Sequence, residues 1–186
     1  MVAGTDTTTT LIEWAMTEIL KNHSIMRRIQ EELENVVGVN NMVKESHLLQ
    51  LIYLDATIKE TFRLHPVVPL GLPRLFWQSN GSSQLGQSLV FKPERFLSIE
   101  GTNKWDFTGN NMKFLPFGSG RRLCPGYPLA EKMQMCILAS LLHSFNWTLP
   151  NGEEHNLFEK FGITLRKTNP LIVIPSQRLS DVSLYM

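Results

Sequence analysis

The chain is poor in cysteine, because only Cys124 and Cys136 occur among its 186 residues. Two cysteines cannot build a disulfide framework, and their scarcity fits a reducing compartment that faces the cytosol. A strong charge of either sign is also missing. The formal net charge is +1, which argues against a nucleic-acid partner. None of the five histidines pairs with another histidine or a cysteine at metal-ligand spacing, so we interpret all five as ordinary residues.

Long hydrophobic runs are absent as well. The best candidate, residues 135–142, is interrupted by Ser140 and is far shorter than the roughly 18 residues that span a bilayer. No basic stretch precedes an apolar core at the N-terminus, so no signal peptide is predicted. The composition, 42% apolar and 19% charged residues, is that of one globular domain with a hydrophobic core.

Hydrophobic residues at helical spacing predict four helices. The predicted ranges are 1–21, 25–37 with Gly38 as the C-cap, 48–65, and a helix that Pro128 opens at its first turn. Asn22 and Ser24 are expected to close the first helix and to cap the second. The expected buried stripe of the fourth helix consists of Leu129, Met133, Cys136, Ile137 and Leu141.

The remaining segments predict a small β component beside these helices. A short strand is expected at 89–91, and a β-hairpin is expected from the apolar segments 163–165 and 171–174. The last ten residues are expected to be loose. The fold class is therefore predicted as mainly α with a small β component.

The most informative motif runs from Phe117 to Gly126 and has the form Phe-x-x-Gly-x-Arg-x-Cys-x-Gly. A Cys124 thiolate can be the fifth ligand of haem iron. Gly120 and Gly126 would let the backbone approach the porphyrin and adopt a positive φ. Arg122 can reach a haem propionate, and Phe117 offers an apolar wall that keeps water from the sulfur. The alternative is a lone core cysteine in a glycine-rich turn, but the fixed spacing favours haem.

This loop resembles the haem-binding signature of the cytochrome P450 monooxygenases, a family in which cysteine ligates the haem iron. The resemblance implies haem b ligated by Cys124. It covers almost the whole chain, so that residues 1–186 would form the C-terminal part of a single P450 domain. That part contains a distal helix, a Glu-x-x-Arg helix, the haem-thiolate loop, a proximal helix and a C-terminal β-hairpin. The family's upstream helices and N-terminal membrane anchor are expected to be absent, and an internal deletion is expected near residues 75–90.

Residues 3–8 resemble the family's helix on the distal side of the haem, where Gly4 leaves room for dioxygen. Asp6 and Thr7 would form an acid–alcohol pair that holds water and delivers protons. The alternative is that the threonine run only begins a helix, although four threonines in a row are poor helix formers. The resemblance also implies mainly small and apolar substrate contacts at Ala3, Thr7, Val67, Val68, Leu70, Gly162 and Ile163.

Glu60 and Arg63 are spaced to share one face of the predicted third helix. By the resemblance, Arg95 would join them in a structural network of two guanidiniums and one carboxylate. The alternative for Glu60 and Arg63 is an exposed ion pair worth about 0.2–0.5 kcal/mol. Only sixteen residues separate Arg74 from Phe91, fewer than in the family, and this puts the approach of Arg95 in doubt.

The resemblance implies an enzyme that inserts one oxygen atom from O2 into a small apolar metabolite. Electrons would come from an NADPH-cytochrome P450 reductase that docks near Arg121 and Lys132. Among plant members, residues 60–69, 91–96 and 159–165 look most like terpenoid hydroxylases related to geraniol hydroxylase. The parent protein would then lie on the cytosolic face of the endoplasmic reticulum membrane. Two alternatives stay open, an inert truncated product that binds haem weakly or not at all, and a haem sensor or carrier.

Overall fold

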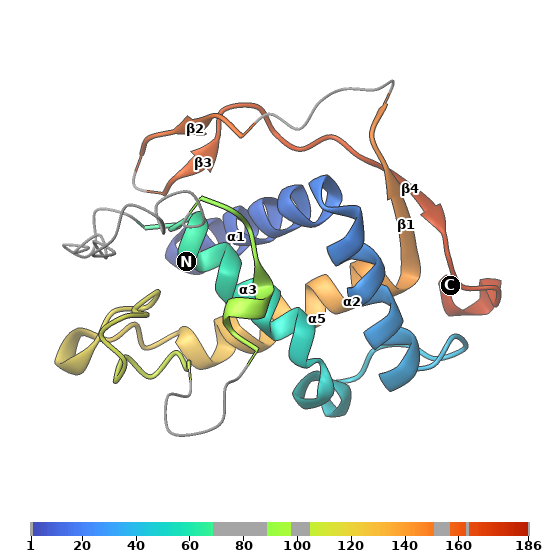
Figure 1. The fold of residues 1–186 in the computed structure, drawn as a ribbon, viewed down its shortest axis with the longest axis horizontal. Coiled ribbons are helices and arrows are strands. Elements are labelled where there is room, and N and C mark those ends of the chain that lie inside the picture. Colours follow the sequence, from blue (N-terminus) through green and yellow to red (C-terminus); the bar gives the residue numbers. More distant parts are fainter. Residues whose placement is uncertain (1, 69–88, 98–104, 151–156, 163, 186) are drawn as a thin grey trace.

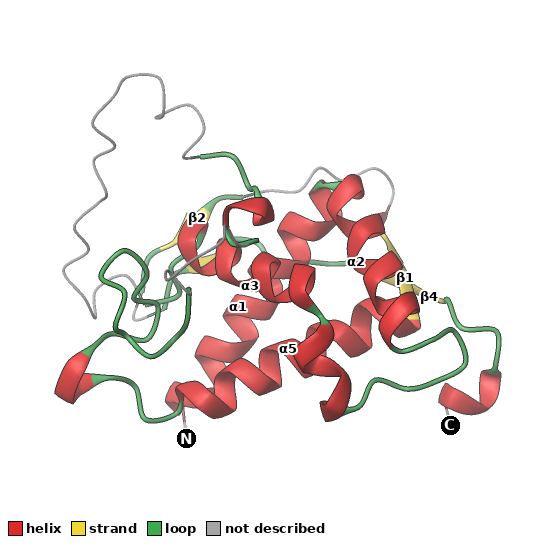
Figure 2. Ribbon diagram, turned by 60° about the horizontal axis from the view of Figure 1, so that its bottom comes forward, coloured by secondary structure: helices red, strands yellow, loops and turns green. Residues whose placement is uncertain are grey.

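The structure is a computed structural model, and it describes residues 2–68, 89–97, 105–150, 157–162 and 164–185. Four helices form the bulk of this part (Figure 1): α1 (Val2–Lys21), α2 (His23–Val36), α3 (Ile52–Leu64) and α5 (Tyr127–Ser144). Their buried side chains belong to one hydrophobic core. Short 3-10 turns accompany them: η1 (Glu45–Gln50), η2 (Pro93–Arg95), η3 (Gly120–Arg122) and η5 (Val182–Tyr185). Strands are few and short, and they lie beside the helical body (Figure 2). The predicted class, mainly α with a small β component, is confirmed.

The junction between α1 and α2 matches the prediction only in part. The side-chain amide of Asn22 donates to the carbonyl oxygen of Glu18 at 2.8 Å and so closes α1. Asn22 makes no side-chain cap to α2, which starts at His23, so the cap prediction is wrong for the second helix. At the other end of α2, Gly38 has a φ of 83°, the left-handed conformation expected after a helix.

The third helix begins later than predicted, because the segment divides into η1 and α3 at Leu51. Both carboxylate oxygens of Glu32 in α2 accept hydrogen bonds from the first turn of α3, from the backbone N–H of Tyr53 at 2.7 Å and of Leu54 at 3.0 Å. A residue from another helix thus satisfies N–H groups that α3 itself leaves open. The predicted face is buried and contains Leu51, Leu54, Ile58 and Phe62.

The predicted buried stripe of α5 is wrong. Leu129 and Met133 are 64% and 43% exposed, and the buried apolar positions are Met135, Leu138, Ala139 and Leu142. This helix is apolar on more than one side, so periodicity alone does not tell which side meets α1, α2 and α3. The exposed apolar residues lie in the first turns of α5, directly after Cys124.

Two antiparallel strand pairs form the β component. β1 (Phe145–Thr148) pairs with β4 (Ile174–Gln177), and β2 (Glu159–Lys160) pairs with β3 (Arg166–Lys167) as a short C-terminal hairpin. A strand pair does form in this region, but the predicted hairpin of segments 163–165 and 171–174 is wrong, and residue 163 lies outside the described residues. The N–H of Leu165 donates to the carbonyl of Val67, and the N–H of Leu171 donates to Glu13. These two backbone donors are therefore not available for the predicted strand pairing.

Residues 89–91 do not form the predicted strand. The carbonyl of Val90 accepts hydrogen bonds from the guanidinium groups of Arg63 and Arg95, at 3.4 and 3.5 Å. The N–H of Lys92 donates to the Glu60 carboxylate at 2.8 Å. Side chains have therefore taken the backbone groups that a strand ladder would need.

The C-terminal end is held in place, contrary to the prediction. The Tyr185 hydroxyl accepts hydrogen bonds from the backbone N–H groups of Arg178 and Leu179 and donates to the carbonyl of Ser144. Among the helices of the described part, none combines the length and apolar character of a membrane-crossing segment.

Candidate functional site

The Cys124 loop, residues 117–126, contains η3, leads into α5 and is closed by its own backbone. The N–H of Cys124 donates to the carbonyl of Phe117 at 3.0 Å, and the N–H of Tyr127 donates to the carbonyl of Cys124 at 3.3 Å. The Cys124 side chain is a free, half-buried thiol. The loop therefore presents one sulfur atom on a backbone fixed at both of its ends.

The glycines of this loop differ in conformation. Gly120 has a φ of 59°, and a Cβ there would meet nothing within 4 Å, so glycine is favoured there by conformation rather than by space. Gly126 has a φ of −87°, so the expected positive φ is wrong at that position. A Cβ on Gly126 would lie 3.9 Å from the Cys124 sulfur, and its absence keeps space beside that atom. Gly118 also adopts a positive φ, of 86°.

The basic residues around the loop are in different states. Arg121 and Arg122 are exposed on η3, and no residue in the described part pairs with either guanidinium. Lys132 of α5 is already paired, because its Nζ lies 2.6 Å from Oε1 of Glu45. The hydrogen bond and the charge of each partner raise the pKa of Lys132 and lower that of Glu45.

Phe117 belongs to an aromatic cluster that sequence reasoning did not single out. Its ring centroid lies 5.2 Å from that of Phe62 in α3 and 5.4 Å from that of Phe107. The aromatic cluster consists of Phe62, Phe96, Trp105, Phe107, Phe114 and Phe117. The many aromatic residues in the thirty positions before Cys124 could have predicted such a cluster. The cluster joins α3 to the Cys124 loop.

Glu60, Arg63 and Arg95 are brought together. Nε and Nη2 of Arg63 donate to Oε2 and Oε1 of Glu60 at 2.6 and 2.9 Å, and Nε of Arg95 donates to Oε1 at 3.3 Å. The Glu60 side chain is 0% exposed. The exposed ion pair considered as the alternative is therefore wrong, since this carboxylate is buried and needs a full set of donors.

Asp6 contacts a residue that sequence reasoning missed. Its Oδ2 lies 2.6 Å from Nη2 of Arg166 in β3, and the Asp6 side chain remains 41% exposed. Nε of Arg166 also donates to the hydroxyl of Thr164 at 2.9 Å. The carboxylate expected to deliver protons is thus tied to the C-terminal hairpin, 160 residues away along the chain.

The threonine run lies inside α1, and Thr7 within it is half-buried. The hydroxyl of Thr8 donates to the carbonyl of Gly4 at 2.8 Å, and that of Thr9 donates to the carbonyl of Thr5 at 3.0 Å. Bonds to the preceding turn satisfy these hydroxyls within the helix. A Cβ on Gly4 would meet nothing within 4 Å, so open space lies against the helix at that point.

The expected substrate contacts are only partly described. Leu70 and Ile163 lie outside the described residues, and of Ala3 only the backbone is described, in α1. Val67 is buried, and Val68 and Gly162 are exposed. The hydrogen bond from Leu165 to the Val67 carbonyl, at 2.8 Å, joins the two segments that carry these residues.

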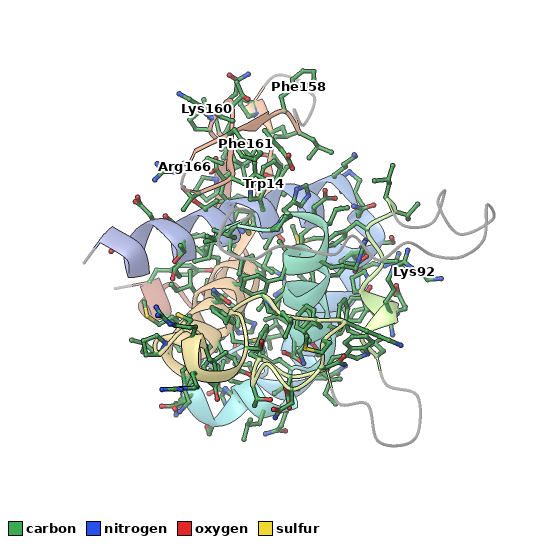
Figure 3. All side chains as sticks on the ribbon, turned by 90° about the vertical axis from the view of Figure 1, so that its left-hand side faces the viewer. Trp14, Lys92, Phe158, Lys160, Phe161 and Arg166 are labelled. Carbon is green, nitrogen blue, oxygen red and sulfur yellow. The ribbon has the colours of Figure 1, made fainter. Side chains whose placement is uncertain are left out.

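Trp14 and His65 connect α1 to the segments that carry Val67 and Gly162. Nε1 of Trp14 donates to the carbonyl of Leu165 at 3.0 Å, and Figure 3 shows Trp14 on α1 below the hairpin. The His65 ring stacks on Trp14 with centroids 4.0 Å apart, and its Nε2 lies 2.8 Å from Oε1 of Glu18. Its Nδ1 lies 3.6 Å from Glu159 of β2. His65, interpreted from sequence as ordinary, connects α1, the end of α3 and the hairpin.

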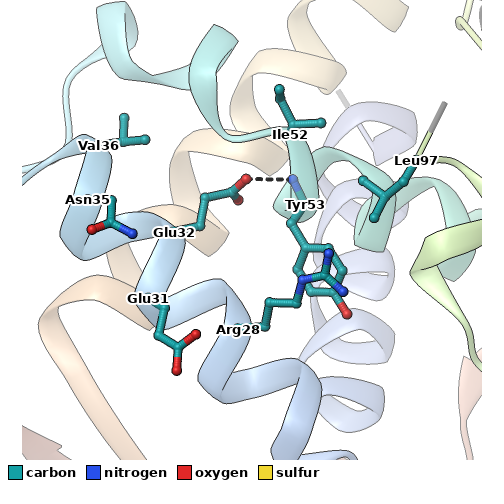
Figure 4. Close-up of a pocket in the computed structure, with 8 residues that line it drawn as sticks. All are labelled: Arg28, Glu31, Glu32, Asn35, Val36, Ile52, Tyr53 and Leu97. Atoms are coloured by element: carbon teal, nitrogen blue, oxygen red, sulfur yellow. Dashed lines mark hydrogen bonds between the residues drawn. The ribbon is translucent and has the colours of Figure 1, made fainter. Parts of the chain in front are cut away.

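A pocket of about 400 Å³ lies between α2 and the start of α3, away from these residues. Figure 4 shows its lining, which is Arg28, Glu31, Glu32, Asn35, Val36, Ile52, Tyr53 and Leu97. Two of its charged groups are used internally. Arg28 lies over the Tyr53 ring at 4.1 Å and pairs with Glu94 at 3.0 Å, and Glu32 accepts the N–H groups of Tyr53 and Leu54. None of the sequence-predicted site residues lines this pocket.

Comparisons with known proteins identify the family. The sequence model of the protein family described as Cytochrome P450 matches residues 1–79 and 87–174. Flavonoid 3'-monooxygenase of Petunia hybrida is 41% identical, with 96% of this chain and 40% of the relative covered. Geraniol 8-hydroxylase of Catharanthus roseus is 42% identical, with 94% and 40% covered. A solved zebra fish cytochrome P450 with abiraterone has a TM-score of 0.74 at 26% identity, covering 95% of this chain and 45% of that one.

The chain spans about two fifths of the length of the curated relatives. The family model matches in two stretches on either side of residues 80–86, and the relatives cover nearly all of the chain. The chain therefore belongs to the cytochrome P450 family.

Proposed function

We propose that this chain carries the haem-thiolate part of a monooxygenase that inserts one oxygen atom from O2 into a small apolar metabolite. The observation that carries the proposal is the Cys124 loop, which holds one free thiol on a fixed backbone with space beside the sulfur at Gly126. This donor set fits haem b, with Cys124 as the thiolate ligand and Arg122, which has no partner among the described residues, at a propionate. When bound, the haem supplies the redox chemistry for using O2.

On the other side of this site, we assign Asp6 and Thr7 to proton delivery. Arg166 holds the Asp6 carboxylate, which stays exposed enough to exchange protons with water. Thr7 follows on the same helix, and the open space against Gly4 is where small molecules can enter. Gly4 and Asp6 are thus the residues whose geometry supports the acid–alcohol assignment.

The substrate class that we propose is a terpenoid. Geraniol 8-hydroxylase and an iridoid oxidase, both of Catharanthus roseus, are 42% and 40% identical to this chain. A flavonoid is the second candidate, since the Petunia relative is named a flavonoid 3'-monooxygenase. Incubating a longer polypeptide that contains this sequence with geraniol or with a flavonoid, together with reductase and NADPH, separates the two. Conversion of the flavonoid alone would exclude the terpenoid assignment.

For the partner, we propose an NADPH-cytochrome P450 reductase that contacts the exposed face of η3. Arg121 offers an exposed positive charge there that no described residue pairs with, whereas Lys132 would first have to leave Glu45. The plant relatives support a membrane enzyme, and we place it on the cytosolic face of the endoplasmic reticulum.

The test of the haem proposal is the absorption spectrum of the purified chain with haem, reduced and exposed to CO. We expect the red-shifted band of thiolate ligation in the unmodified chain and in the Cys136→Ser control. The Cys124→Ser variant should lose it. The same band in Cys124→Ser, or no such band in the unmodified chain, would contradict the proposal.

An inert truncated product remains the second candidate, and one observation favours it. The alignment to the Petunia relative runs over 203 positions although this chain has 186 residues, so the relative has residues without a counterpart here. This supports the deletion expected near 75–90, most of which lies outside the described residues. Stable haem binding without NADPH-dependent turnover would favour a haem carrier or sensor. Weak or absent haem binding would favour the inert product.

A further inference from the structure

Gly109 leaves no room for a side chain. A Cβ built there would lie 2.5 Å from the carbonyl oxygen of Gly118, 2.8 Å from Cα of Ser119 and 3.1 Å from Cβ of Ser119. Cβ atoms in proteins do not come within such distances of backbone atoms, which cannot move aside as the end of a flexible side chain can. The φ of Gly109 is 77°, a conformation that residues with a Cβ disfavour.

The turn that contains Gly109 is fixed by its own side chains. Oδ1 of Asp106 accepts hydrogen bonds from the N–H of Thr108 at 3.1 Å and from its hydroxyl at 2.6 Å. Nδ2 of Asn110 donates to the same hydroxyl oxygen at 2.9 Å. An aspartate that bonds its own backbone two residues on is a stable turn, and here it holds the Gly109 backbone against the next segment.

The turn is also anchored in the aromatic cluster. Phe107 is buried, and its ring lies 5.6 Å from Phe62 of α3 and 5.4 Å from Phe117. Because Phe62 lies two residues after Glu60 on α3, the turn packs against the helix that Arg63, Arg95 and the N–H of Lys92 hold through the Glu60 carboxylate. A shift between Gly109 and Gly118 therefore cannot be absorbed easily by movement of the turn.

The backbone that Gly109 contacts is the beginning of the Cys124 loop, directly before η3. Gly118 and Ser119 lie between Phe117, whose carbonyl accepts the N–H of Cys124, and η3, which begins at Gly120. Displacing residues 118 and 119 would move both the hydrogen-bond acceptor of Cys124 and the turn that precedes it.

We propose that Gly109 is a positioning residue for the Cys124 sulfur, acting through the contact of its backbone with Gly118 and Ser119. The inference rests on the proposed function in that Cys124 is taken as the iron ligand. It adds that the ligand's place is set by a residue outside the cysteine motif.

The test compares Gly109→Ala with Gly38→Ala. The two glycines have φ values of 77° and 83°, so alanine imposes a similar conformational cost at both. A Cβ on Gly38 would meet only the Asn41 side-chain nitrogen, at 3.3 Å, far along the chain from Cys124. Both variants are made with Cys136→Ser, so that alkylation of the haem-free chain reports on Cys124 alone. Urea unfolding and the reduced CO spectrum are measured in parallel.

We expect both alanine variants to lower the urea midpoint. Only Gly109→Ala should change the alkylation rate of Cys124 several-fold and weaken the thiolate band. Equal alkylation rates and equal bands in the two variants would overturn the inference. If Gly109→Ala does not fold, Asp106→Ala replaces it, because it loosens the turn without adding a side chain at 109. A folded Asp106→Ala with an unchanged alkylation rate would likewise overturn the inference.

The alkylation measurement separates this inference from the haem proposal. A changed rate in Gly109→Ala, with no thiolate band in the unmodified chain, would support the positioning role and contradict the haem assignment. A thiolate band of the same strength in both glycine variants, with equal alkylation rates, would support haem ligation and overturn the positioning role.

Discussion

Glu60 and Asp6 both hold a guanidinium, but in opposite surroundings. The Glu60 side chain is fully buried and accepts hydrogen bonds from Arg63, Arg95 and the N–H of Lys92, whereas Asp6 is 41% exposed and pairs with Arg166. A carboxylate without water needs every donor in place, because an unpaired buried charge is strongly destabilising. A carboxylate in contact with water can change its partner or its protonation at little cost. The first arrangement suits a scaffold, and the second suits proton transfer.

Replacing Glu60 should have the largest effect on stability. Glu60→Gln leaves two guanidiniums facing a neutral amide, and we expect the free energy of unfolding to fall by about 3–5 kcal/mol. Urea unfolding followed by tryptophan fluorescence measures it. Glu31→Gln is the control, since Glu31 makes an exposed helix pair with Arg27 that is worth about 0.3–0.5 kcal/mol. Similar midpoints for the two variants would remove the contrast between buried and exposed carboxylates.

Replacing Trp14 should have the second largest effect on stability. Trp14→Phe leaves the Leu165 carbonyl without its indole donor in a buried place, which should cost about 1–3 kcal/mol. Trp147→Phe is the matched control, because its indole also donates to a leucine carbonyl, that of Leu141 at 3.1 Å, but from a half-buried position. Thermal unfolding should show the larger loss for Trp14→Phe. The reverse order would mean that burial does not decide the strength of these contacts.

Tyr53 tests the surroundings of Glu94, the neighbour of Arg95. Burial and the hydrogen bond to Glu94 raise the pKa of Tyr53 from 10.0 to about 12. The folded chain holds this proton more tightly than the unfolded chain, so the contribution to stability is complete below pH 10.0 and is lost as the pH rises toward about 12. The difference between the ultraviolet titrations of the unmodified chain and Tyr53→Phe should have its midpoint near pH 12. A midpoint near pH 10 would contradict it.

Asp6 should have the smallest effect on stability. Asp6→Asn removes an exposed pair, so the free energy of unfolding should change by less than about 1 kcal/mol. In a longer polypeptide that turns over, loss of a proton-delivery group should lower the rate about a hundredfold or more at unchanged haem content. Arg166→Gln serves as the control, because it breaks the same pair but keeps the carboxylate. Equal turnover in Asp6→Asn and the unmodified enzyme would contradict the assignment of Asp6 to proton delivery.

Local patterns predicted what depends on neighbours in the sequence. The first two helices, the spacing of Glu60 and Arg63 and the positive φ of Gly120 are all set within a few residues, and the structure has them as predicted. The buried side of α5 could not be predicted in this way, because its neighbours α1, α2 and α3 select it and the helix is apolar on more than one side.

Contacts between distant residues left no local pattern. Asp6 and Arg166 are 160 residues apart, and Trp14 and Leu165 are 151 apart, so neither contact follows from spacing. The constraint on Gly109 becomes visible only when its distance to Gly118 is known. The resemblance supplied the identity of the Cys124 loop, but the turn that supports the loop needed the structure.

The attachment of the C-terminal segment depends on one oxygen atom, the hydroxyl of Tyr185. It makes three hydrogen bonds, to Arg178, Leu179 and Ser144, and so fastens the chain's last turn to the end of α5. The Tyr185→Phe variant would lack a single oxygen atom and with it all three of these hydrogen bonds. It would thereby release the final segment from the helix that begins just after the cysteine.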